Sequence, residues 1–469
     1  MKRLIHPKWF CFLTVACGPM MATMDSSAVN VSLPTIARLY QASLNDVEWV
    51  IVSYLLTMAA LLLPFGRLGD QWGRKKLFRV GMVFFTVSSI FCALSLSVPQ
   101  LVVSRIIQGI GGAIFISITP AILVDSFPTS ERGKAIGLMG TIVSTGLMVG
   151  APLGGFLTHY LSWRWIFLIN IPIGILGYFL AGMNLPKDPV SDKKIRFDFP
   201  GALSIVLASS TFLFALNKIS TWGMDSVWTL GLFCVSFLLF IQFLKIEHKN
   251  PLGVLDLNLF RRPLILGGSF SLLFHFMALF ILYFLTPFYL TEVLHLKPHE
   301  VGLTLMFFSI GFAMVTPISG WLSDKVGSRI LSPVGLSLLA ILYFGASTLN
   351  ERSQGWHVSL LLMLVGACGG LFQAPNNSAL LGAVQRPHLG TVSSIIATMR
   401  TFGIMMGVAF GTLLFSLYVQ LTNGLGKHFT PQEVPAHLFV GGYHFALLCA
   451  AAIACIAVFF SLYRVRPEF

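Results

Sequence analysis

The stretch Gly66-Arg-Leu-Gly-Asp-Gln-Trp-Gly-Arg-Lys-Lys76 decides the fold. It is a short run of glycines and charged residues between two long apolar segments, Trp49–Phe65 and Leu77–Leu96. A weaker copy, Gly320-Trp-Leu-Ser-Asp-Lys-Val-Gly-Ser-Arg329, follows 254 residues later. A tight cationic turn between two membrane helices, present once in each half, indicates a duplicated membrane protein of the kind that transports solutes.

Composition places the chain in a membrane. Hydrophobic residues make up 55% of the 469 residues and charged residues 10%, whereas soluble chains average roughly 25% charged residues. The net charge of +13 does not indicate nucleic-acid binding, because the basic residues lie in short loops between apolar segments and not on one face. The seven cysteines lie inside apolar segments and are interpreted as buried thiols rather than disulfides or metal ligands.

The apolar segments and the loop charges predict the topology. About fourteen segments are long enough to span a bilayer, and the first has no convincing cleavage site, so we expect an uncleaved first span. Of the 31 Lys and Arg residues, 23 fall on the side of both termini, 6 on the other side and 2 within spans. By the positive-inside rule, this predicts a multi-pass protein of the cell membrane (inner or plasma membrane) with both termini in the cytoplasm.

A second pair of loops supports the duplication and suggests domain boundaries. The loop Phe127–Gly137 has an echo in Val384–Ser393, 257 residues later when Gly133 is compared with Gly390. We predict an all-α integral membrane fold with the bundles related by an axis along the membrane normal. Its parts are an N-terminal six-helix bundle (1–186), a cytoplasmic linker with an extra two-helix hairpin (187–255) and a C-terminal six-helix bundle (256–469).

Five motifs resemble those of the major facilitator superfamily and of its fourteen-helix drug:proton antiporter-2 family. The Gly66–Lys76 turn resembles motif A, and Arg105-Ile-Ile-Gln-Gly-Ile-Gly-Gly112 resembles motif B. The stretch Met24-Asp-Ser-Ser-Ala-Val-Asn-Val-Ser-Leu-Pro34 is similar to the first-span pattern of the antiporter-2 family, and Trp163–Gly174 and Phe197–Gly201 are similar to its later motifs. The resemblance covers essentially the whole chain and implies the major facilitator fold.

The fifth predicted span resembles the antiporter motif Gly-Pro-x-x-Gly-Gly. Ala151 stands where the motif has its proline, and Pro152 follows one residue later. The motif is the family's usual mark of exporters, so the shift bears on the direction of transport and leaves the fold prediction unchanged. The resemblance assigns helix packing to Gly150, Pro152, Gly154 and Gly155.

Asp25 is the only acidic residue that we place deep in the bilayer. It precedes Pro34 by nine residues and so lies roughly 14 Å from the outer end of its helix, at about 1.5 Å per residue. A carboxylate there costs roughly 2.5–3.5 kcal/mol, so it should face a cavity or a partner. Desolvation favours its protonated form, and a nearby cationic substrate would expel that proton. We predict proton coupling for Asp25, with a purely structural carboxylate as the alternative.

Arg105, in the outer half of the membrane, is predicted to pair with Asp25 or to control its protonation by proximity. The resemblance to motif B also implies a role in proton coupling. An arginine that reaches the outer interface is the alternative.

Further polar residues inside predicted spans are candidates for a substrate cavity. Arg400 lies near mid-bilayer and must meet water, a carbonyl, a carboxylate or an anionic substrate group. A structural contact and a substrate contact are equally favoured for it. His275 can titrate near neutrality, although a packed histidine is the commoner case. The amides around Pro375 suit either a broken helix lining a cavity or contacts between helices. The cavity set is Asp25, Asn30, His275, Gln373, Asn376, Asn377 and Arg400.

The Gly66–Lys76 turn is interpreted as a conformational latch. Glycines permit a tight turn, and a carboxylate there accepts hydrogen bonds at a helix N-terminus or pairs with an arginine. By resemblance, the turn stabilises the outward-open arrangement and releases during alternation, while its basic residues also set topology. The latch residues are Gly66, Gly69, Asp70, Gly73, Arg74 and Asp324.

These features predict proton-coupled efflux (antiport) of amphipathic or lipophilic small molecules, of the multidrug type, by alternating access. The sequence has no nucleotide-binding Gly-x-x-x-x-Gly-Lys-[Ser/Thr] element and no catalytic or metal-ligand cluster, so we expect no enzyme activity, cofactor or metal. Expected partners are protons, a small-molecule substrate and the lipid bilayer, with a periplasmic adaptor protein if the source is a double-membrane bacterium, and no nucleic acid. The alternatives are a dedicated exporter of one endogenous compound (a siderophore, lipid or metabolite) and a non-transporting membrane sensor.

Overall fold

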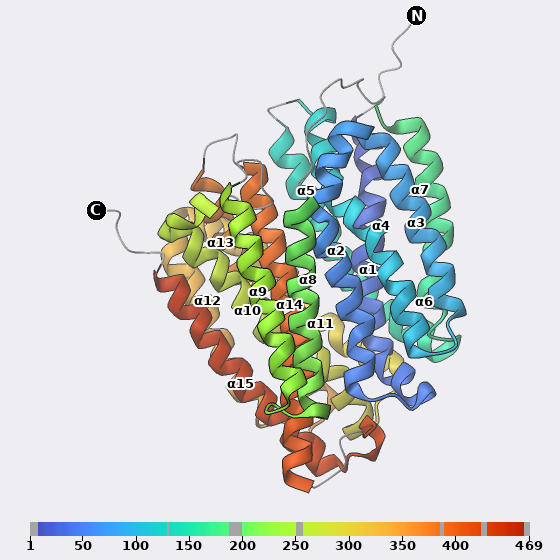
Figure 1. Cartoon of the computed structure of the whole chain (residues 1–469), viewed down its shortest axis with the longest axis vertical. Coiled ribbons are helices and arrows are strands. Elements are labelled where there is room, and N and C mark those ends of the chain that lie inside the picture. The colour runs from blue at the N-terminus through green and yellow to red at the C-terminus, as the bar shows by residue number, and fades with distance from the viewer. Residues whose placement is uncertain are drawn as a thin grey trace, which may run out of the picture.

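The computed structural model describes residues 8–128, 131–186, 199–249, 257–384, 389–423 and 429–463, and these residues form helices and no strands (Figure 1). The first half contains α1 (Lys8–Tyr40), α2 (Leu44–Trp72), α3 (Arg74–Leu94), α4 (Val98–Ser126), α5 (Arg132–Tyr160), α6 (Trp165–Leu168) and α7 (Asn170–Asn184). Two further helices follow, α8 (Phe199–Trp222) and α9 (Val227–Lys249). The second half contains α10 (Pro263–Phe288), α11 (Pro298–Val326), α12 (Ser328–Ala346), α13 (Gly355–Gly382), α14 (Leu389–Asn423) and α15 (Ala436–Tyr463).

The helices have the length and composition of membrane spans. Among the described residues, eleven helices are long and apolar enough to cross a bilayer, with α6 and α7 counted as one. The helices α1, α5 and α8, of 33, 29 and 24 residues, lie outside that set. Together they make fourteen long helical segments in the described part of the chain, as the sequence predicts.

Local sequence sets the helix ends. At the start of α2, Ser43 accepts a hydrogen bond from the backbone of Asp46 at 3.3 Å, and the Asp46 carboxylate accepts one from the Ser43 backbone at 3.1 Å. This reciprocal cap satisfies amide groups that a helix start leaves without partners. Between α2 and α3, Gly73 has φ 98°, and between α11 and α12, Gly327 has φ 90°. A side chain disfavours this backbone conformation, so both copies of the predicted turn require a glycine at that position.

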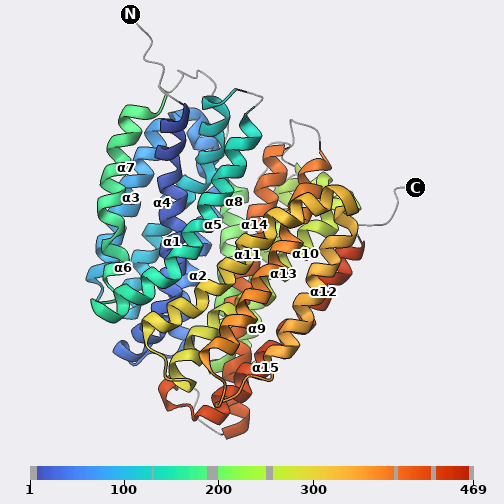
Figure 2. The same ribbon diagram turned by 180° about the vertical axis from the view of Figure 1, so that it is seen from behind.

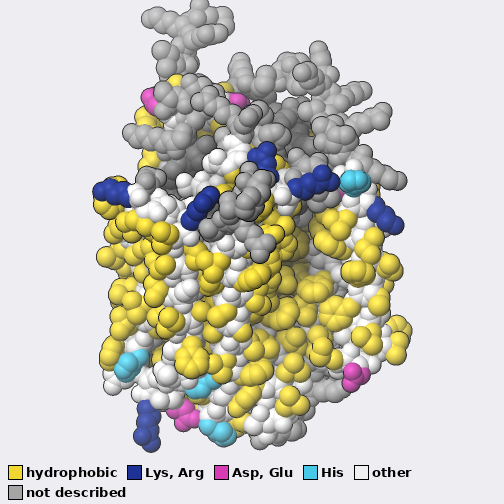
Figure 3. Space-filling model, turned by 90° about the vertical axis from the view of Figure 1, so that its left-hand side faces the viewer, with side chains coloured by type: hydrophobic (Ala, Val, Ile, Leu, Met, Phe, Trp, Pro, Cys, Tyr) yellow, Lys and Arg dark blue, Asp and Glu magenta, His cyan; other side chains and the backbone are white. Residues whose placement is uncertain are grey.

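The helices gather into two bundles with a helix pair beside them (Figures 1 and 2). The helices α1–α7 pack on one another, α10–α15 do the same, and α8 packs against α9. The helix α8 also contacts both α2 and α14, so it lies across the seam between the two bundles. A broad apolar surface covers the middle of the face seen in Figure 3, with charged and histidine side chains gathered above and below it. This is the surface that a bilayer requires.

The two bundles contact each other toward one face of the molecule. We call the face where α1 begins and α15 ends the terminal face, and the opposite one the far face (Figure 2). Ser416 of α14 donates a hydrogen bond to the Asn45 side chain at 3.4 Å, and an ion pair joins Arg38 to Glu292 at 3.1 Å. The His159 and His299 rings lie 4.4 Å apart between α5 and α11. Because these residues lie at far-face helix ends, the bundles are closed against each other there.

Candidate functional site

A buried ion pair lies inside the first bundle. Asp25 of α1 is 1% exposed and Arg105 of α4 is 0% exposed, and Arg105 Nη1 donates to Asp25 Oδ2. The structure thus brings together the two residues that the sequence singles out for proton coupling. A buried pair of this kind is held by its surroundings, because each charge has lost its hydration.

Amide side chains complete the coordination of the Asp25 carboxylate. Asn170, the first residue of α7, donates to Asp25 Oδ1 at 2.9 Å, and Gln108 Nε2 lies 3.3 Å from the same oxygen. Gln108 Oε1 accepts from Arg105 Nη1 at 2.6 Å, and Gln108 Nε2 donates to Ser89 of α3 at 2.9 Å. Helices α1, α3, α4 and α7 therefore meet at one polar network, whose members strengthen one another in a low-dielectric interior.

Arg105 links this network to α2. Its Nε donates to the Val50 carbonyl at 3.1 Å, and its guanidinium lies 4.1 Å from the centre of the Tyr54 ring. Arg105 Nη2 and Tyr54 Oη are buried without a hydrogen-bond partner among the described residues. A change in the charge of Asp25 would therefore alter the contacts of α2 as well as those of α4, since the Arg105 guanidinium belongs to α4 and contacts α2.

Small residues of α5 let it approach α1 at the level of Asp25. A Cβ on Gly150 would lie 2.5 Å from the Met24 carbonyl oxygen, and one on Gly154 would lie 2.6 Å from Ala28 Cα. Gly155 faces the other way, and a Cβ there would strike the Pro298 carbonyl of α11. The helix α5 continues through Pro152. The motif glycines thus pack α5 on α1 within the first bundle and on α11 of the second.

Three of the predicted cavity residues make contacts between helices. Asn30 of α1 donates to the Tyr283 carbonyl of α10 at 2.9 Å, across the two bundles. Asn376 of α13 donates to the Gly268 carbonyl of α10 at 3.1 Å. His275 of α10 is 2% exposed and packs against Phe372 with tilted rings whose centres are 4.8 Å apart, while its Nδ1 has no partner among the described residues.

The remaining cavity candidates are Arg400, Gln373 and Asn377, which lie on α14 and α13. Arg400 of α14 is half-buried and forms no ion pair or hydrogen bond with any residue that the structure describes. Gln373 is half-buried, and Asn377 Oδ1 is buried without a partner in the described part of the chain. The helix α13 continues through Pro375 from Gly355 to Gly382. Of the two alternatives for the amides around Pro375, the structure therefore does not have the broken helix, because Pro375 is accommodated within a continuous one.

The latch turn is held through Arg74. At the start of α3, Arg74 donates to the Ala121 carbonyl of α4 at 3.1 Å and forms an ion pair with Asp125. A Cβ on Gly69 would lie 2.9 Å from Ile118, whereas one on Gly66 would meet nothing within 4 Å. The side chains of Asp70 and Asp324, which the sequence assigns to the latch, lie outside those that the structure describes.

Sequence reasoning missed several members of these clusters. Gln108 and Asn170 lie inside the quoted motifs, and Gln108 follows Arg105 by three residues, a spacing that puts both on one helix face. Asp125 carries no signal apart from its place at the end of a span. Glu48 is 1% exposed at the far-face end of α2. Sequence reasoning misses Glu48 because it lies at the edge of a predicted span. It is a buried acid like Asp25, but on a different helix.

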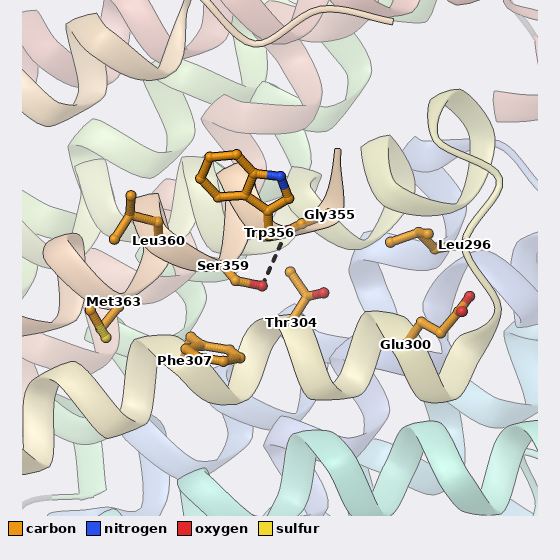
Figure 4. Close-up of a pocket in the computed structure, with 9 residues that line it drawn as sticks. All are labelled: Leu296, Glu300, Thr304, Phe307, Gly355, Trp356, Ser359, Leu360 and Met363. Carbon is orange, nitrogen blue, oxygen red and sulfur yellow. Dashed lines mark hydrogen bonds between the residues drawn. The ribbon is translucent and has the colours of Figure 1, made fainter. Parts of the chain in front are cut away.

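A separate cavity lies at the far-face ends of α11 and α13, with a volume of about 420 Å³ (Figure 4). Glu300 and Thr304 come from α11, and Trp356 and Met363 come from α13. A second crevice, of about 730 Å³, lies between α2, α4 and α8. Neither cavity is lined by a residue that the sequence predicts for the substrate site.

The family model of the Major Facilitator Superfamily matches residues 15–267 and 268–469. The chain belongs to the major facilitator superfamily. The double match agrees with the internal duplication, and the motif resemblance to the drug:proton antiporter-2 family lies within this superfamily. Members of the superfamily are transporters, and the helical architecture described above is theirs.

Curated relatives of this major facilitator chain cover nearly its whole length. The riboflavin transporter RibZ of Clostridioides difficile (strain 630) is 32% identical over 422 residues, which cover 90% of this chain and 91% of RibZ. The uncharacterized transporter YebQ of Escherichia coli (strain K12) is 30% identical, covering 98% of this chain and 96% of YebQ. The putative multidrug resistance protein MdtD of Salmonella typhi is 29% identical, covering 96% and 93%.

Solved structures share the fold at low identity. A bacterial homologue of the human lysosomal transporter Spinster, inward-facing and unoccupied, superposes with a TM-score of 0.69 at 16% identity and covers 99% of this chain and 98% of its own. The D-xylose–proton symporter gives a TM-score of 0.65 at 15% identity, covering 95% and 97%. These likenesses concern the fold of the major facilitator superfamily alone.

Proposed function

We propose that this protein is a proton-coupled antiporter that exports amphipathic or lipophilic small molecules by alternating access. The single observation that carries the proposal is the buried Asp25–Arg105 pair with its amide partners. An ionisable residue inside a membrane bundle is expensive to maintain, so by default it marks an ion pathway. Among the described residues, Asp25 is the only acid that is paired with an arginine at full burial.

The proton acts at one carboxylate. Protonation of Asp25 at Oδ2 would remove its charge and leave Arg105 with only its carbonyl and amide contacts, to Val50 and Gln108. Because Arg105 contacts both α2 and α4, the two protonation states favour different arrangements of these helices. Asp25 is enclosed by its partners, so coupling through helix movement is better supported than direct contact between Asp25 and substrate.

The direction of the cycle follows from charge and closure. The excess of Lys and Arg on the terminal face supports a cytoplasmic location for that face in a cell membrane. With the bundles in contact at the far face, this conformation would correspond to a state of the cycle that is closed to the outside. A proton bound from outside and released to the cytoplasm would drive export. A periplasmic adaptor protein remains an expected partner if the source is a double-membrane bacterium.

The substrate class has two candidates. The half-buried Arg400, which has no partner among the described residues, suits a substrate with an anionic or strongly polar group, and the 41 phenylalanines favour apolar cargo. The second candidate is a dedicated transporter of one endogenous compound. It is favoured by the 32% identity over 90% of the chain to a protein named as a riboflavin transporter.

The test uses purified protein in liposomes that contain a fluorescent pH indicator. An imposed pH gradient should drive ethidium or riboflavin against the proton flow, and the indicator should report a proton flux that depends on the added compound. Asp25→Asn should abolish both fluxes while the protein remains inserted. Glu351→Gln, an exposed acid in the α12–α13 connection, is the matched control and should transport normally. Compound flux without proton flux in the unaltered protein would contradict antiport.

A panel of other compounds separates the two substrate candidates. Movement of several unrelated dyes supports the multidrug type, whereas movement of riboflavin alone supports the dedicated transporter. A complete absence of flux for every compound would favour the membrane-sensor alternative.

A further inference from the structure

A second buried carboxyl lies where three separate parts of the chain meet. Glu48, near the start of α2, is 1% exposed. Asn217 of the inserted helix α8 donates to Glu48 Oε1 and to the Asn45 carbonyl, the latter at 2.9 Å. The Thr412 hydroxyl of α14 faces the same carboxyl. Glu48 therefore contacts the first bundle, the second bundle and the inserted helix pair at once.

The hydrogen bonds around Glu48 match a neutral carboxylic acid. Thr412 Oγ1 donates to the Val408 carbonyl at 3.1 Å, and its lone pairs are then available to a donor on Glu48. Glu48 Oε2 receives no hydrogen bond from the described part of the chain. A protonated Oε2 would donate to Thr412, while Oε1 accepts from Asn217. An ionised carboxylate would keep a charged Oε2 that no described residue hydrogen-bonds, which is costly in a buried site.

No described cation neutralises this carboxyl. Asp46, two residues earlier on α2, adds a like charge near Glu48. On α8, Lys218 lies over the rings of Phe214 and Trp222, at 5.5 and 5.9 Å. The ion pairs formed by described residues do not include Glu48. A like charge nearby and no partner of opposite sign both favour the neutral form.

We propose that Glu48 is an external proton-binding site that holds the far-face gate closed while protonated. The inference rests on the alternating-access cycle proposed above, in which α2 and α14 must separate at this face. Separation would expose Glu48 to external water, where it ionises and returns its proton to the outside. Closure requires the proton again, because a charged Glu48 cannot re-enter the junction cheaply. The inserted helix α8, through Asn217, positions the carboxyl for this exchange.

The pH dependence has a definite sign. The closed gate binds one more proton than the open gate, so raising the pH favours opening. Within the window where only the closed state is protonated, the ratio of closed to open protein falls by up to about tenfold per pH unit. Glu48→Gln mimics the neutral acid and removes this dependence.

The experiment measures the distance between two spin labels at the far face. Labels are placed at Gln41, in the exposed α1–α2 connection, and at Leu421, which is 85% exposed at the end of α14. The seven native cysteines are replaced first. The protein is then measured in lipid nanodiscs between about pH 5 and about pH 9, to include the pH range in which only the closed state is protonated. The unaltered gate should gain a long-distance population as pH rises.

The variants decide the outcome. Glu48→Gln should stay at short distance across the range, and the control Glu351→Gln should follow the unaltered protein. A pH profile of Glu48→Gln that matches the unaltered protein would overturn the proposal. Thr412→Val removes the α14 hydroxyl that faces Glu48 and should shift the pH at which the gate opens. It also keeps the test valid if Glu48→Gln folds poorly, because an unshifted Thr412→Val profile counts equally against the proposal.

Asp25→Asn separates this inference from the proposed antiport. It should abolish proton-driven exchange in liposomes and keep the pH response of the gate. If the unaltered protein exchanges no protons yet its gate responds to pH through Glu48, antiport is wrong and the gate site stands. If proton exchange is intact and Glu48→Gln leaves the pH response of the gate unchanged, antiport stands and the gate site is wrong.

Discussion

The two bundles share a scaffold and differ in the chemistry that it carries. In the first bundle, Gly150 of α5 faces the Met24 carbonyl of α1. In the second, Gly407 of α14 faces the Met277 carbonyl of α10, again with 2.5 Å to an added Cβ. Gly150 and Gly407 are 257 residues apart, the offset of the repeated loops. Asp25, which follows Met24, therefore corresponds to Ala278.

The same register holds between the neighbouring helix pairs. Gly109 of α4 faces the Tyr54 carbonyl, and Gly366 of α13 faces the Phe308 carbonyl. Counting back from these glycines aligns Arg105 with Leu362 and Gln108 with Val365.

The corresponding sites therefore differ in kind. The network of Asp25, Arg105 and Gln108 in the first bundle is replaced in the second by Ala278, Leu362 and Val365, each 0% exposed. One geometry thus accepts either a charged network or hydrocarbon. The charges are not needed to build a bundle, which supports a functional reason for keeping them in one copy only.

Exchanging the chemistry of the two bundles should have the largest effect. The triple variant Asp25→Ala, Arg105→Leu, Gln108→Val gives the first bundle the second bundle's residues. It should lose all proton-driven exchange and keep its stability, because replacing a buried ion pair by hydrocarbon is often neutral or stabilising. Asp25→Ala alone should cost about 3–5 kcal/mol, since it leaves Arg105 uncompensated. Thermal unfolding in detergent measures the stability, and exchange in liposomes measures the proton coupling. A triple variant less stable than Asp25→Ala would contradict the conclusion that the charged network is not needed to build the bundle.

The packing glycines should show where the scaffold matters for coupling. Gly150→Ala and Gly407→Ala each push against a backbone carbonyl, so each should cost about 1–3 kcal/mol of stability. Only Gly150→Ala displaces the residue beside Asp25, so it should also reduce the number of protons moved per substrate. Gly345→Ala, where nothing lies within 4 Å, is the control for the substitution itself. Equal loss of coupling in the Gly150 and Gly407 variants would break the comparison.

The two buried amides should differ by the charge of their partner. Asn170→Leu removes a hydrogen bond to the Asp25 carboxylate and should cost about 1.5–3 kcal/mol, whereas Asn376→Leu removes one to a neutral carbonyl and should cost about 0.5–1.5 kcal/mol. Denaturation midpoints measure the difference. A proton-coupling defect is expected for Asn170→Leu alone, and finding it for Asn376→Leu would place the second bundle in the proton pathway.

The repeated turns should behave alike and show the smallest effect. Gly73→Ala and Gly327→Ala force a side chain into backbone with φ near 90°, at a cost of at least about 1 kcal/mol each. Comparing the transport turnover rate of each variant with its thermal stability shows whether either turn controls the rate of the conformational change. A slower cycle in Gly73→Ala only would assign the latch to the first copy, where Arg74 contacts Asp125.

Much of the fold follows from the sequence, because apolar length, loop charge and turn glycines are local properties. The motifs also placed Asp25 and Arg105 in one bundle. Gln108 and Asn170 were quoted within motifs without a role, since their importance depends on which helices meet. The sequence left a broken helix and contacts between helices open at Pro375, and only the packing decided for a continuous helix. Glu48 was missed because it lies at the edge of a span.

The sequence by itself determined a membrane protein of about fourteen spans, duplicated, with one acid deep in its first span. These features depend on hydrophobicity and spacing along the chain, which no partner can alter. Only the tertiary structure decided that Asp25 is enclosed by three donors, that its counterpart is Ala278, and that Glu48 lies between both bundles and α8. Such contacts join residues from 80 to several hundred positions apart, and packing of whole helices, not local pattern, brings them together.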